Sequence, residues 1–297
     1  MIVIGSRGSQ LALWQSRWVA VRLEALGEQT RIEIIKTTGD RVTDIPLGQV
    51  GSKGIFTKEI EDALLDGSID LAVHSLKDMP TELPTGLVLA AIPEREDVRD
   101  ALAGQKLDDL ARGARVGTGS LRRAAQLRAL RPDLEVLPIR GNVDTRLRKL
   151  DEGQYDAIIL AAAGLARLGL SARISQYFEA EEMCPAVGQG ALAIETRDSK
   201  REIAVRLNDP STAAAVQAER SLLGALGGGC QVPVGAYAHL SGAELHLRAI
   251  VASPDGSRIA QSLLTGSVAK PEDLGRRVAD ELLEQGAQEL LNSADPR

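Results

Sequence analysis

Residues 115 to 123, Arg115-Val-Gly-Thr-Gly-Ser-Leu-Arg-Arg123, decide the fold class of this 297-residue chain. A short strand, Arg115–Gly117, runs into a turn of small residues and then into a helix predicted from Leu121 to Leu130. A chain that alternates strands and helices in this way favours parallel or mixed sheets with helices on both faces. In such sheets ligands bind beyond the carboxyl ends of the strands. The turn that follows this strand is therefore the first candidate site.

The same alternation extends through the first two-thirds of the chain. Further strands are predicted at Ile2–Gly5, Thr30–Thr37, Ile69–Ser75, Glu135–Ile139 and Asp156–Ala162, and further helices at Leu11–Ala25, Ile55–Leu65, Val143–Leu150 and Gly164–Leu168. The last third has a different pattern. There we expect an Ala-rich helix, Ser211–Leu226, three strands, Gln231–His239, Glu244–Val251 and Arg258–Leu264, and a closing helix, Pro271–Leu291. This pattern is typical of a small, separate α+β domain.

Arginine is concentrated in the middle of the chain. Residues 112 to 148 contain nine arginines, no lysine and three acidic residues, although the whole chain has a net charge of -6. A solvated basic face would explain this composition. However, the basic candidates Arg7, Lys77, Arg122, Arg140 and Arg167 all lie at or just past predicted strand ends. This placement favours an anion site, because the guanidinium fork binds carboxylates through two hydrogen bonds at once.

The turn at Gly117–Arg123 has the features of an anion site. Backbone N–H groups at a helix N-terminus favour anions, and Thr118 and Ser120 add hydroxyl groups. Arg122 and Arg123 in the first helical turn oppose the helix dipole, and a bound anion would compensate for them. The alternative is an ordinary helix cap with arginines lying along the apolar surface. Arg140 and Arg146 repeat the arrangement after the next strand.

Two further segments contain potentially reactive groups. Asp78 follows a strand end and is a candidate general acid–base group or a stabiliser of a cationic intermediate. A structural aspartate paired with Lys77 is the alternative. Cys230 lies in Gly227-Gly-Gly-Cys-Gln-Val-Pro233, where the glycines leave room for a large group beside a nucleophilic sulfur. A small buried thiol is the alternative there, and Cys184 is interpreted as structural.

Composition argues against several classes of protein. The two cysteines and three scattered histidines form neither a disulfide framework nor a metal-ligand pattern, so no metal is expected. A magnesium site made of carboxylates is the alternative that composition leaves open. No apolar run approaches the roughly 20 residues that span a bilayer. The chain opens at once with a strand, so no secretory signal is expected, and we predict a soluble cytoplasmic protein. Nucleic-acid binding is disfavoured because stacking aromatics are missing from residues 112–148. A non-catalytic binder of small carboxylated ligands remains an alternative to an enzyme.

Four motifs carry a resemblance to a known family. They are Val73-His-Ser-Leu-Lys-Asp-Met-Pro80, Gly119-Ser-Leu-Arg-Arg123, Leu137-Pro-Ile-Arg-Gly-Asn142 and Gly227-Gly-Gly-Cys-Gln-Val-Pro233. In their order and spacing the chain resembles the porphobilinogen deaminase (hydroxymethylbilane synthase) family from near residue 2 to near residue 290. The resemblance implies a transferase that joins four porphobilinogen molecules head to tail into hydroxymethylbilane, with release of four ammonia. It also implies a dipyrromethane cofactor attached through a thioether to Cys230, and a monomer with no nucleic-acid or membrane partner.

The resemblance also assigns roles to individual residues. Asp78 matches the catalytic aspartate, which contacts pyrrole N–H groups, assists ammonia loss and stabilises a cationic azafulvene-like intermediate. The residues that match positions binding cofactor and substrate are Arg7, Ser9, Lys77, Thr118, Ser120, Arg122, Arg123, Arg140, Arg146 and Arg167. Gly39–Gly54 matches a mobile loop over the cleft, with Lys53 and Phe56 near it. Gly119 stands where the family commonly has serine, and Gly8 and Gln10 replace residues often seen as Gln and Pro.

The fold implied by the resemblance is α/β. It consists of a two-lobed pair of domains with mixed sheets, like periplasmic binding proteins, and a small α+β C-terminal domain. Domain 1, with the catalytic aspartate, is expected at residues 1–93 and 190–208. Domain 2, rich in arginine, is expected at 94–189. Domain 3, with the cofactor-attachment cysteine, is expected at 209–297.

Overall fold

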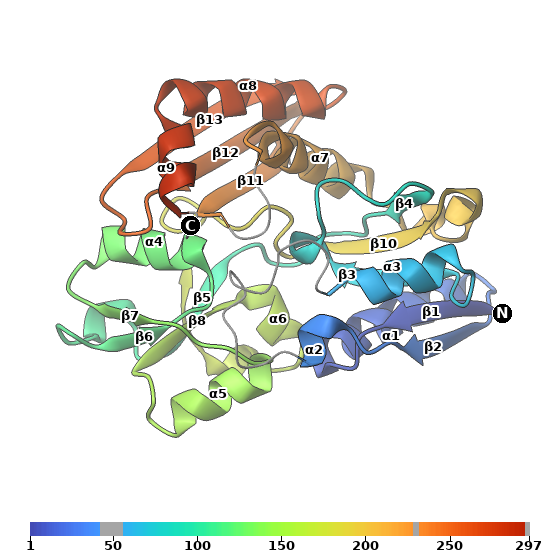
Figure 1. The fold of residues 1–297 in the computed structure, drawn as a ribbon, viewed down its shortest axis with the longest axis horizontal. Helices are drawn as coiled ribbons and strands as arrows, with labels where there is room; N and C mark the ends of the chain where they lie inside the picture. Colours follow the sequence, from blue (N-terminus) through green and yellow to red (C-terminus); the bar gives the residue numbers. More distant parts are fainter. Residues whose placement is uncertain (42–55, 228–231, 295–297) are drawn as a thin grey trace. The chain divides into compact units, whose positions relative to one another are not determined.

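The computed structural model describes residues 1–41, 56–227 and 232–294. The chain divides into two compact units, one of Met1–Arg95 with Ala191–Ala213 and the other of Glu96–Gly190 with Ala214–Arg297. The described residues form two five-stranded mixed sheets and one three-stranded sheet (Figure 1). The predicted α/β class, with mixed sheets and a small α+β C-terminal region, is confirmed. The division into three domains at the expected boundaries stays a prediction.

The first unit is built on a sheet with the strand order β2-β1-β3-β10-β4. Its strands are β1 (Ile2–Ser6), β2 (Thr30–Ile34), β3 (Leu71–Ser75), β4 (Leu87–Ala91) and β10 (Leu192–Arg197). β1 pairs in parallel with β2 and β3, whereas β10 pairs antiparallel with β3 and β4. The sheet is therefore mixed, with one strand reversed among parallel neighbours.

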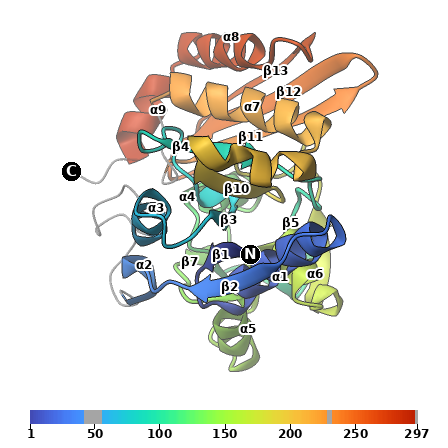
Figure 2. The same ribbon diagram turned by 90° about the vertical axis from the view of Figure 1, so that its right-hand side faces the viewer.

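Helices cover both faces of this sheet. They are α1 (Gln10–Ala25), α2 (Thr38–Arg41) and α3 (Lys58–Leu65), and short 3₁₀ turns lie at Leu76–Asp78, Asp198–Ile203 and Val205–Leu207. α1 contributes Val19, Ala20 and Leu23 to the cluster on one face, and α3 contributes Ile60 and Leu64 to the cluster on the other. Figure 2 shows α1 and α3 on opposite sides of the sheet. Because both faces are covered, the free edge at the strand ends is where polar groups can gather.

The second unit contains a sheet with the order β7-β6-β8-β5-β9. Its strands are β5 (Asp100–Gly104), β6 (Arg115–Gly117), β7 (Glu135–Leu137), β8 (Ala157–Ala161) and β9 (Ile174–Phe178). Its helices are α4 (Leu121–Leu130), α5 (Val143–Asp151) and α6 (Ala162–Arg167), and 3₁₀ turns lie at Leu107–Asp109 and Ser171–Arg173. β6 is parallel to β7 and β8, and β5 runs antiparallel to β8 and β9. This sheet therefore repeats the plan of the first.

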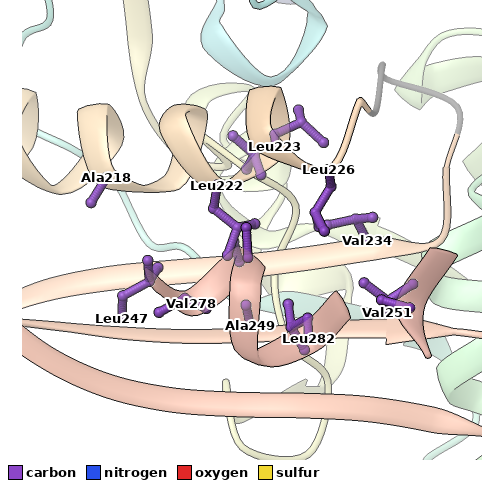
Figure 3. Close-up of a cluster of buried hydrophobic side chains, with 14 of the residues drawn as sticks. Ala218, Leu222, Leu223, Leu226, Val234, Leu247, Ala249, Val251, Val278 and Leu282 are labelled. Carbon is purple, nitrogen blue, oxygen red and sulfur yellow. The ribbon is translucent and has the colours of Figure 1, made fainter. Parts of the chain in front are cut away.

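The C-terminal part of the second unit is an antiparallel sheet covered by helices. Its strands are β11 (Val234–Ser241), β12 (Glu244–Ala252) and β13 (Ile259–Ser267), and its helices are α7 (Pro210–Ala225), α8 (Pro271–Glu284) and α9 (Ala287–Ala294). Leu222 of α7 and Leu226, just after that helix, pack with Leu247 of β12 and Leu282 of α8 in one apolar cluster (Figure 3). This cluster is the core of the α+β region.

The opposite face of the same sheet contacts α4. Ile250 and Ala252 of β12 pack with Ala125 of α4 and the buried Cys184. Arg128 of α4 donates from Nη1 to the carbonyl of Pro254, at 2.7 Å. These contacts explain why residues 96–190 and the C-terminal sheet fall into one compact unit.

The prediction of a single closing helix, Pro271–Leu291, is wrong. Helix α8 ends at Glu284, and α9 begins at Ala287. Gly286 between them has a φ of +88°, a left-handed conformation that glycine adopts readily and that interrupts an α-helix. Within the described ranges, no helix is both long and apolar enough to cross a membrane.

Candidate active site

Two adjacent strands bring four of the predicted residues to one edge of the first sheet. β1 and β3 are parallel neighbours, with Ile4 opposite Leu71, so the segments that follow them leave the sheet at the same edge. Arg7 and Ser9 follow β1, and Lys77 and Asp78 lie in the 3₁₀ turn after β3. The pairing of these strands therefore gathers a carboxylate, two cationic groups and a hydroxyl along a single edge.

Buried neighbours fix the turn that carries Asp78. Leu76 and Met79, on either side of the Lys77–Asp78 pair, are 0% and 2% exposed. The Leu76 amide donates to the carbonyl of Ala191 at 3.0 Å, which ties the turn to the start of β10. Gln15 Nε2 of α1 donates to Ser75 Oγ at 2.9 Å, just before the turn. The backbone around Asp78 is thus anchored from both neighbouring elements.

The Asp78 side chain itself is exposed. Among the residues that the structure describes, its carboxylate has no hydrogen bond and no ion pair, so the alternative of an aspartate paired with Lys77 has no support in the geometry. A fixed backbone with an open carboxylate is the arrangement expected of a group that acts on a ligand.

Arg7 and Ser9 are each held by a local contact. The Arg7 guanidinium lies over the Phe56 ring, 4.1 Å from its centroid, a cation–π contact. Ser9 is the N-cap of α1, and its Oγ accepts a hydrogen bond from the Ala12 amide at 3.3 Å. Of the remaining predictions for the loop and the cofactor, Lys53, Cys230 and most of Gly39–Gly54 lie outside the described residues.

The second sheet gathers the other predicted residues in the same way. β7, β6 and β8 are parallel neighbours, so their carboxyl ends share one edge, and β5 begins at this edge because Asp100 pairs with Ala161. The predicted residues that follow these three strands are Thr118, Ser120, Arg122, Arg123, Arg140, Arg146 and Arg167. We call the carboxyl ends of β7, β6 and β8 with these seven residues and Asp100 the arginine edge.

Two of these arginines converge on a buried carboxylate. Arg122 Nη1 lies 2.7 Å from Asp100 Oδ2, and Arg123 Nη2 lies 2.7 Å from Asp100 Oδ1. Arg122, Arg123 and Asp100 are 3%, 6% and 0% exposed. Burial acts to raise the pKa of the Asp100 carboxyl, but the charges and hydrogen bonds of the two arginines outweigh it and hold that pKa well below its ordinary value. Asp100 is therefore ionised at neutral pH.

Further groups complete this buried network. Gln189 Nε2 donates to Asp100 Oδ1 at 2.8 Å, and Arg122 Nη1 also donates to the Cys184 carbonyl at 2.6 Å. Arg123 Nη1 donates to the Ile159 carbonyl at 3.2 Å. Among the described residues, Arg122 Nε is buried with no hydrogen-bond partner. Two guanidinium groups and one carboxylate leave an excess of one positive charge in this buried network.

Sequence reasoning missed Asp100 and Gln189 as members of the site. The available signal was the pair of arginines in the first turn of α4, because two buried cations require a nearby anion. Nothing in the sequence indicated that the anion would come from the start of a strand about 20 residues earlier.

The hydroxyl groups of the arginine edge cap the start of α4. Thr118 Oγ1 accepts from the Ser120 amide at 3.2 Å, and Ser120 Oγ accepts from the Arg123 amide at 3.4 Å. A Cβ at Gly119 would lie 2.8 Å from the carbonyl oxygen of Ile139. The glycine at this position therefore permits a close approach between this turn and the segment after β7.

The other three arginines of this edge differ in their contacts. Arg146 Nε donates to the Gly141 carbonyl at 2.7 Å. Arg140 is half-buried, and its Nη1 has no hydrogen-bond partner within the described ranges. Arg167 is buried and donates to the Gly190 carbonyl at 2.6 Å. Burial lowers the pKa of Arg167 to about 10, against the opposing charge of Glu96, so it remains a cation at neutral pH.

The fold and these two edges define the chain as an α/β protein with an open carboxylate on one mixed sheet and a cluster of partly neutralised arginines on the other. In the described parts of the chain, no three His, Cys, Asp or Glu side chains come together as a metal site. Residues 2–205 match the family model described as porphobilinogen deaminase, dipyromethane cofactor binding domain, and residues 213–284 match porphobilinogen deaminase, C-terminal domain. The chain belongs to the porphobilinogen deaminase family.

Curated relatives agree over nearly the whole length. The chain is 52% identical to a porphobilinogen deaminase of Syntrophobacter fumaroxidans, with 98% of this chain and 97% of that protein covered. It is 51% identical to a porphobilinogen deaminase of Thiobacillus denitrificans, with 98% of each chain covered. The resemblance identified from four motifs is thereby confirmed.

Solved structures give more distant likenesses. One is a periplasmic substrate-binding protein of an ABC transporter from Coxiella burnetii, with a TM-score of 0.44, 15% identity, and 70% of this chain and 91% of that chain covered. Another is a nutrient-binding protein from Burkholderia cenocepacia bound to methionine, with a TM-score of 0.41, 12% identity, and 68% and 87% covered.

Proposed function

We propose that this protein is a transferase that joins four porphobilinogen molecules head to tail into hydroxymethylbilane and releases four ammonia. We further propose that it grows the product on a dipyrromethane cofactor attached through a thioether to Cys230. The observation that carries the proposal is the open carboxylate of Asp78, held on a fixed turn at a strand end in a chain that matches the family almost end to end.

The residues of the arginine edge fit such a cofactor. Each ring of a dipyrromethane carries an acetate and a propionate, so the group is a polyanion. The edge has an excess of positive charge, and the buried, unpartnered Nε of Arg122 is a donor that a carboxylate can satisfy. We propose that Thr118, Ser120, Arg122, Arg123, Arg140, Arg146 and Arg167 hold the cofactor and the growing chain. When bound, the cofactor supplies the pyrrole carbon to which the first substrate is joined.

Asp78 is proposed to act on the reacting ring. Loss of ammonia from the aminomethyl group leaves positive charge on the substrate, and a carboxylate beside that charge stabilises it. Once a bond has formed to a pyrrole carbon, that carbon must lose its proton, and a carboxylate oxygen of Asp78 can accept it. The fixed turn keeps the carboxylate in place through both events.

The cationic groups beside Asp78 are proposed to orient the substrate. Arg7, Lys77 and Ser9 share one sheet edge with Asp78 and match the family's binding positions. Two of the substrate's own substituents are carboxylates, which Arg7 and Lys77 can bind. We propose that Lys53 and Phe56 act beside them, and the contact of Arg7 with the Phe56 ring supports this for Phe56.

We also propose that the protein acts as a cytoplasmic monomer with no nucleic-acid or membrane partner. The net charge of -6 and the lack of aromatic residues for base stacking in residues 112–148 support the proposal that no nucleic acid is bound. Sedimentation of the purified protein tests the monomer, and the proposal fails on this point if the mass is twice that of one chain.

The reaction is tested by measuring substrate loss and ammonia release together. We expect one ammonia for each porphobilinogen consumed and one hydroxymethylbilane for every four. Tight binding of porphobilinogen without ammonia release would instead support a non-catalytic binder of carboxylated ligands.

A further inference from the structure

Asp100 is a buried carboxylate placed among cations that are expected to bind carboxylated ligands. It lies at the start of β5 and is fully buried. It receives hydrogen bonds from Arg122 Nη1 at 2.7 Å, from Arg123 Nε at 2.9 Å and from Gln189 Nε2 at 2.8 Å. Each of its oxygens is thus bound by at least one arginine, which is the type of contact that an incoming ligand carboxylate would make.

The charge at this site depends on Asp100. Without it, two buried guanidinium groups would face one another with no anion between them, at a large electrostatic cost. With it, the site carries one positive charge in excess and one buried donor, Arg122 Nε, with no partner among the described residues. The group of Arg122, Arg123 and Asp100 therefore has the charge and the donor to bind one more carboxylate, rather than two.

Resting on the proposed function, we infer that Asp100 is a positioning residue that fixes Arg122 and Arg123 and limits the strength with which they hold the carboxylates of the growing chain. A bound chain that lengthens must exchange its carboxylates among the arginines, and a product must leave. An internal carboxylate that shares the same donors weakens each ligand contact and keeps this exchange fast.

The test compares anion binding by proteins that carry no cofactor. All variants are made in the full chain with Cys230→Ser, and succinate and sulfate are the probes in calorimetry. In Asp100→Asn the carboxylate is replaced by a neutral amide of similar shape, so the excess charge rises. We expect the dissociation constant for both probes to fall by at least about tenfold, because charge interactions at such distances are strong in a buried site.

Two further variants test the sign of the effect. Asp100→Glu keeps the charge, and we expect it to restore anion affinity to near that of the parent. Gln189→Glu places a second carboxylate beside Arg123, and we expect weaker anion binding. Because Gln189→Glu predicts the opposite change, the inference does not depend on Asp100→Asn folding well.

A matched control comes from the same unit. Asp133 accepts two hydrogen bonds from Arg131, both at 2.8 Å, but it precedes β7 and so lies away from the arginine edge. Asp133→Asn therefore removes the same charge from an Arg–Asp pair, and we expect unchanged affinity for both probes.

Turnover distinguishes positioning from a merely structural role. With Cys230 intact, we expect Asp100→Asn to lower KM and kcat together, since the chain is held more tightly and released more slowly. A structural role alone predicts a higher KM with no gain in anion affinity, and that outcome would overturn the inference. A lower melting temperature is expected in either case, because the buried pair is broken. Failure of the parent enzyme to release ammonia would count against the proposed function instead, because the anion measurements do not require it.

Discussion

The two five-stranded sheets share one plan but place their acidic groups in opposite ways. In the sheet of the first unit, Asp78 is exposed and has no partner among the described residues, while the reversed strand β10 contributes Glu195 to a buried contact with His74, at 3.1 Å. In the sheet of the second unit, the reversed strand β5 brings Asp100 to the arginines. The same topology thus leaves one carboxylate exposed and unpaired among the described residues and uses another to neutralise cations. Asp78 lies in the turn after its strand and is exposed, whereas Asp100 is the first residue of its strand and is buried.

The largest expected effect is the loss of catalytic rate on substitution of Asp78, the exposed member of the Asp78 and Asp100 pair under comparison. Asp78→Asn should lower the rate of porphobilinogen consumption by about 10²–10⁴-fold, the range for loss of a general acid–base group. Its melting temperature should equal that of the parent, because no described contact is lost. Unchanged turnover in Asp78→Asn would show that the reacting carboxylate lies elsewhere.

The second largest effect is on stability, where we expect substitution of Asp100 to matter more than substitution of Asp78. Asp100→Ala should lower the free energy of unfolding by about 3–5 kcal/mol, because it leaves two buried arginines without their anion. Urea denaturation of the full chain measures this. Asp78→Ala and Asp133→Ala are the controls, and a loss in either control as large as in Asp100→Ala would contradict the assignment of the buried network.

The pH dependence of stability provides a sharper test of the same network. The folded-state pKa of Asp100 lies below its unfolded value of about 3.9, so its contribution is present at higher pH and is lost as the pH falls below about 4. We expect the stability of Asp100→Asn to fall less steeply than that of the parent between pH 4 and pH 2. Equal slopes in urea titrations at these pH values would mean that Asp100 is not held ionised by the arginines.

The smallest expected effect is the loss of stability when the serine that caps α1 or α4 is replaced. Ser9 Oγ accepts from the Ala12 amide, and Ser120 Oγ accepts from the Arg123 amide. Replacement of either serine by alanine should cost about 1 kcal/mol of stability, and replacement by glycine only a few tenths. If the hydroxyls also hold ligand carboxylates, the KM for porphobilinogen should rise in both the alanine and the glycine variants, whatever their stability.

The sequence predicted the parallel strands better than the reversed ones. β1, β3, β6 and β8 were found from short apolar runs followed by helices. The sequence pattern does not predict β4, β5, β9 or β10 as strands. The two reversed strands among them have the sequences Asp-Ala-Leu-Ala-Gly (β5) and Leu-Ala-Ile-Glu-Thr-Arg (β10). β5 and β10 are almost wholly buried, so they lack the alternation that marks a half-exposed strand, and alanine does not favour a strand over a helix.

Only the part of the candidate site that follows recognised parallel strands could be predicted from the sequence. Residues that follow parallel strands share an edge by topology, so Arg7 with Asp78, and Thr118 with Arg140, could be grouped without coordinates. Asp100 could not, since its contact with Gln189 joins residues 89 positions apart and its strand was not recognised. The break in the closing helix was missed because a single glycine, Gly286, is tolerated in many helices.

The most direct test of the proposed function is the intact mass of the purified protein. We expect a mass greater than that of the sequence by two pyrrole units, and an unmodified mass for Cys230→Ser. A wild-type protein that converts porphobilinogen to hydroxymethylbilane at full rate, yet has the mass of the bare chain, would contradict a cofactor attached to Cys230.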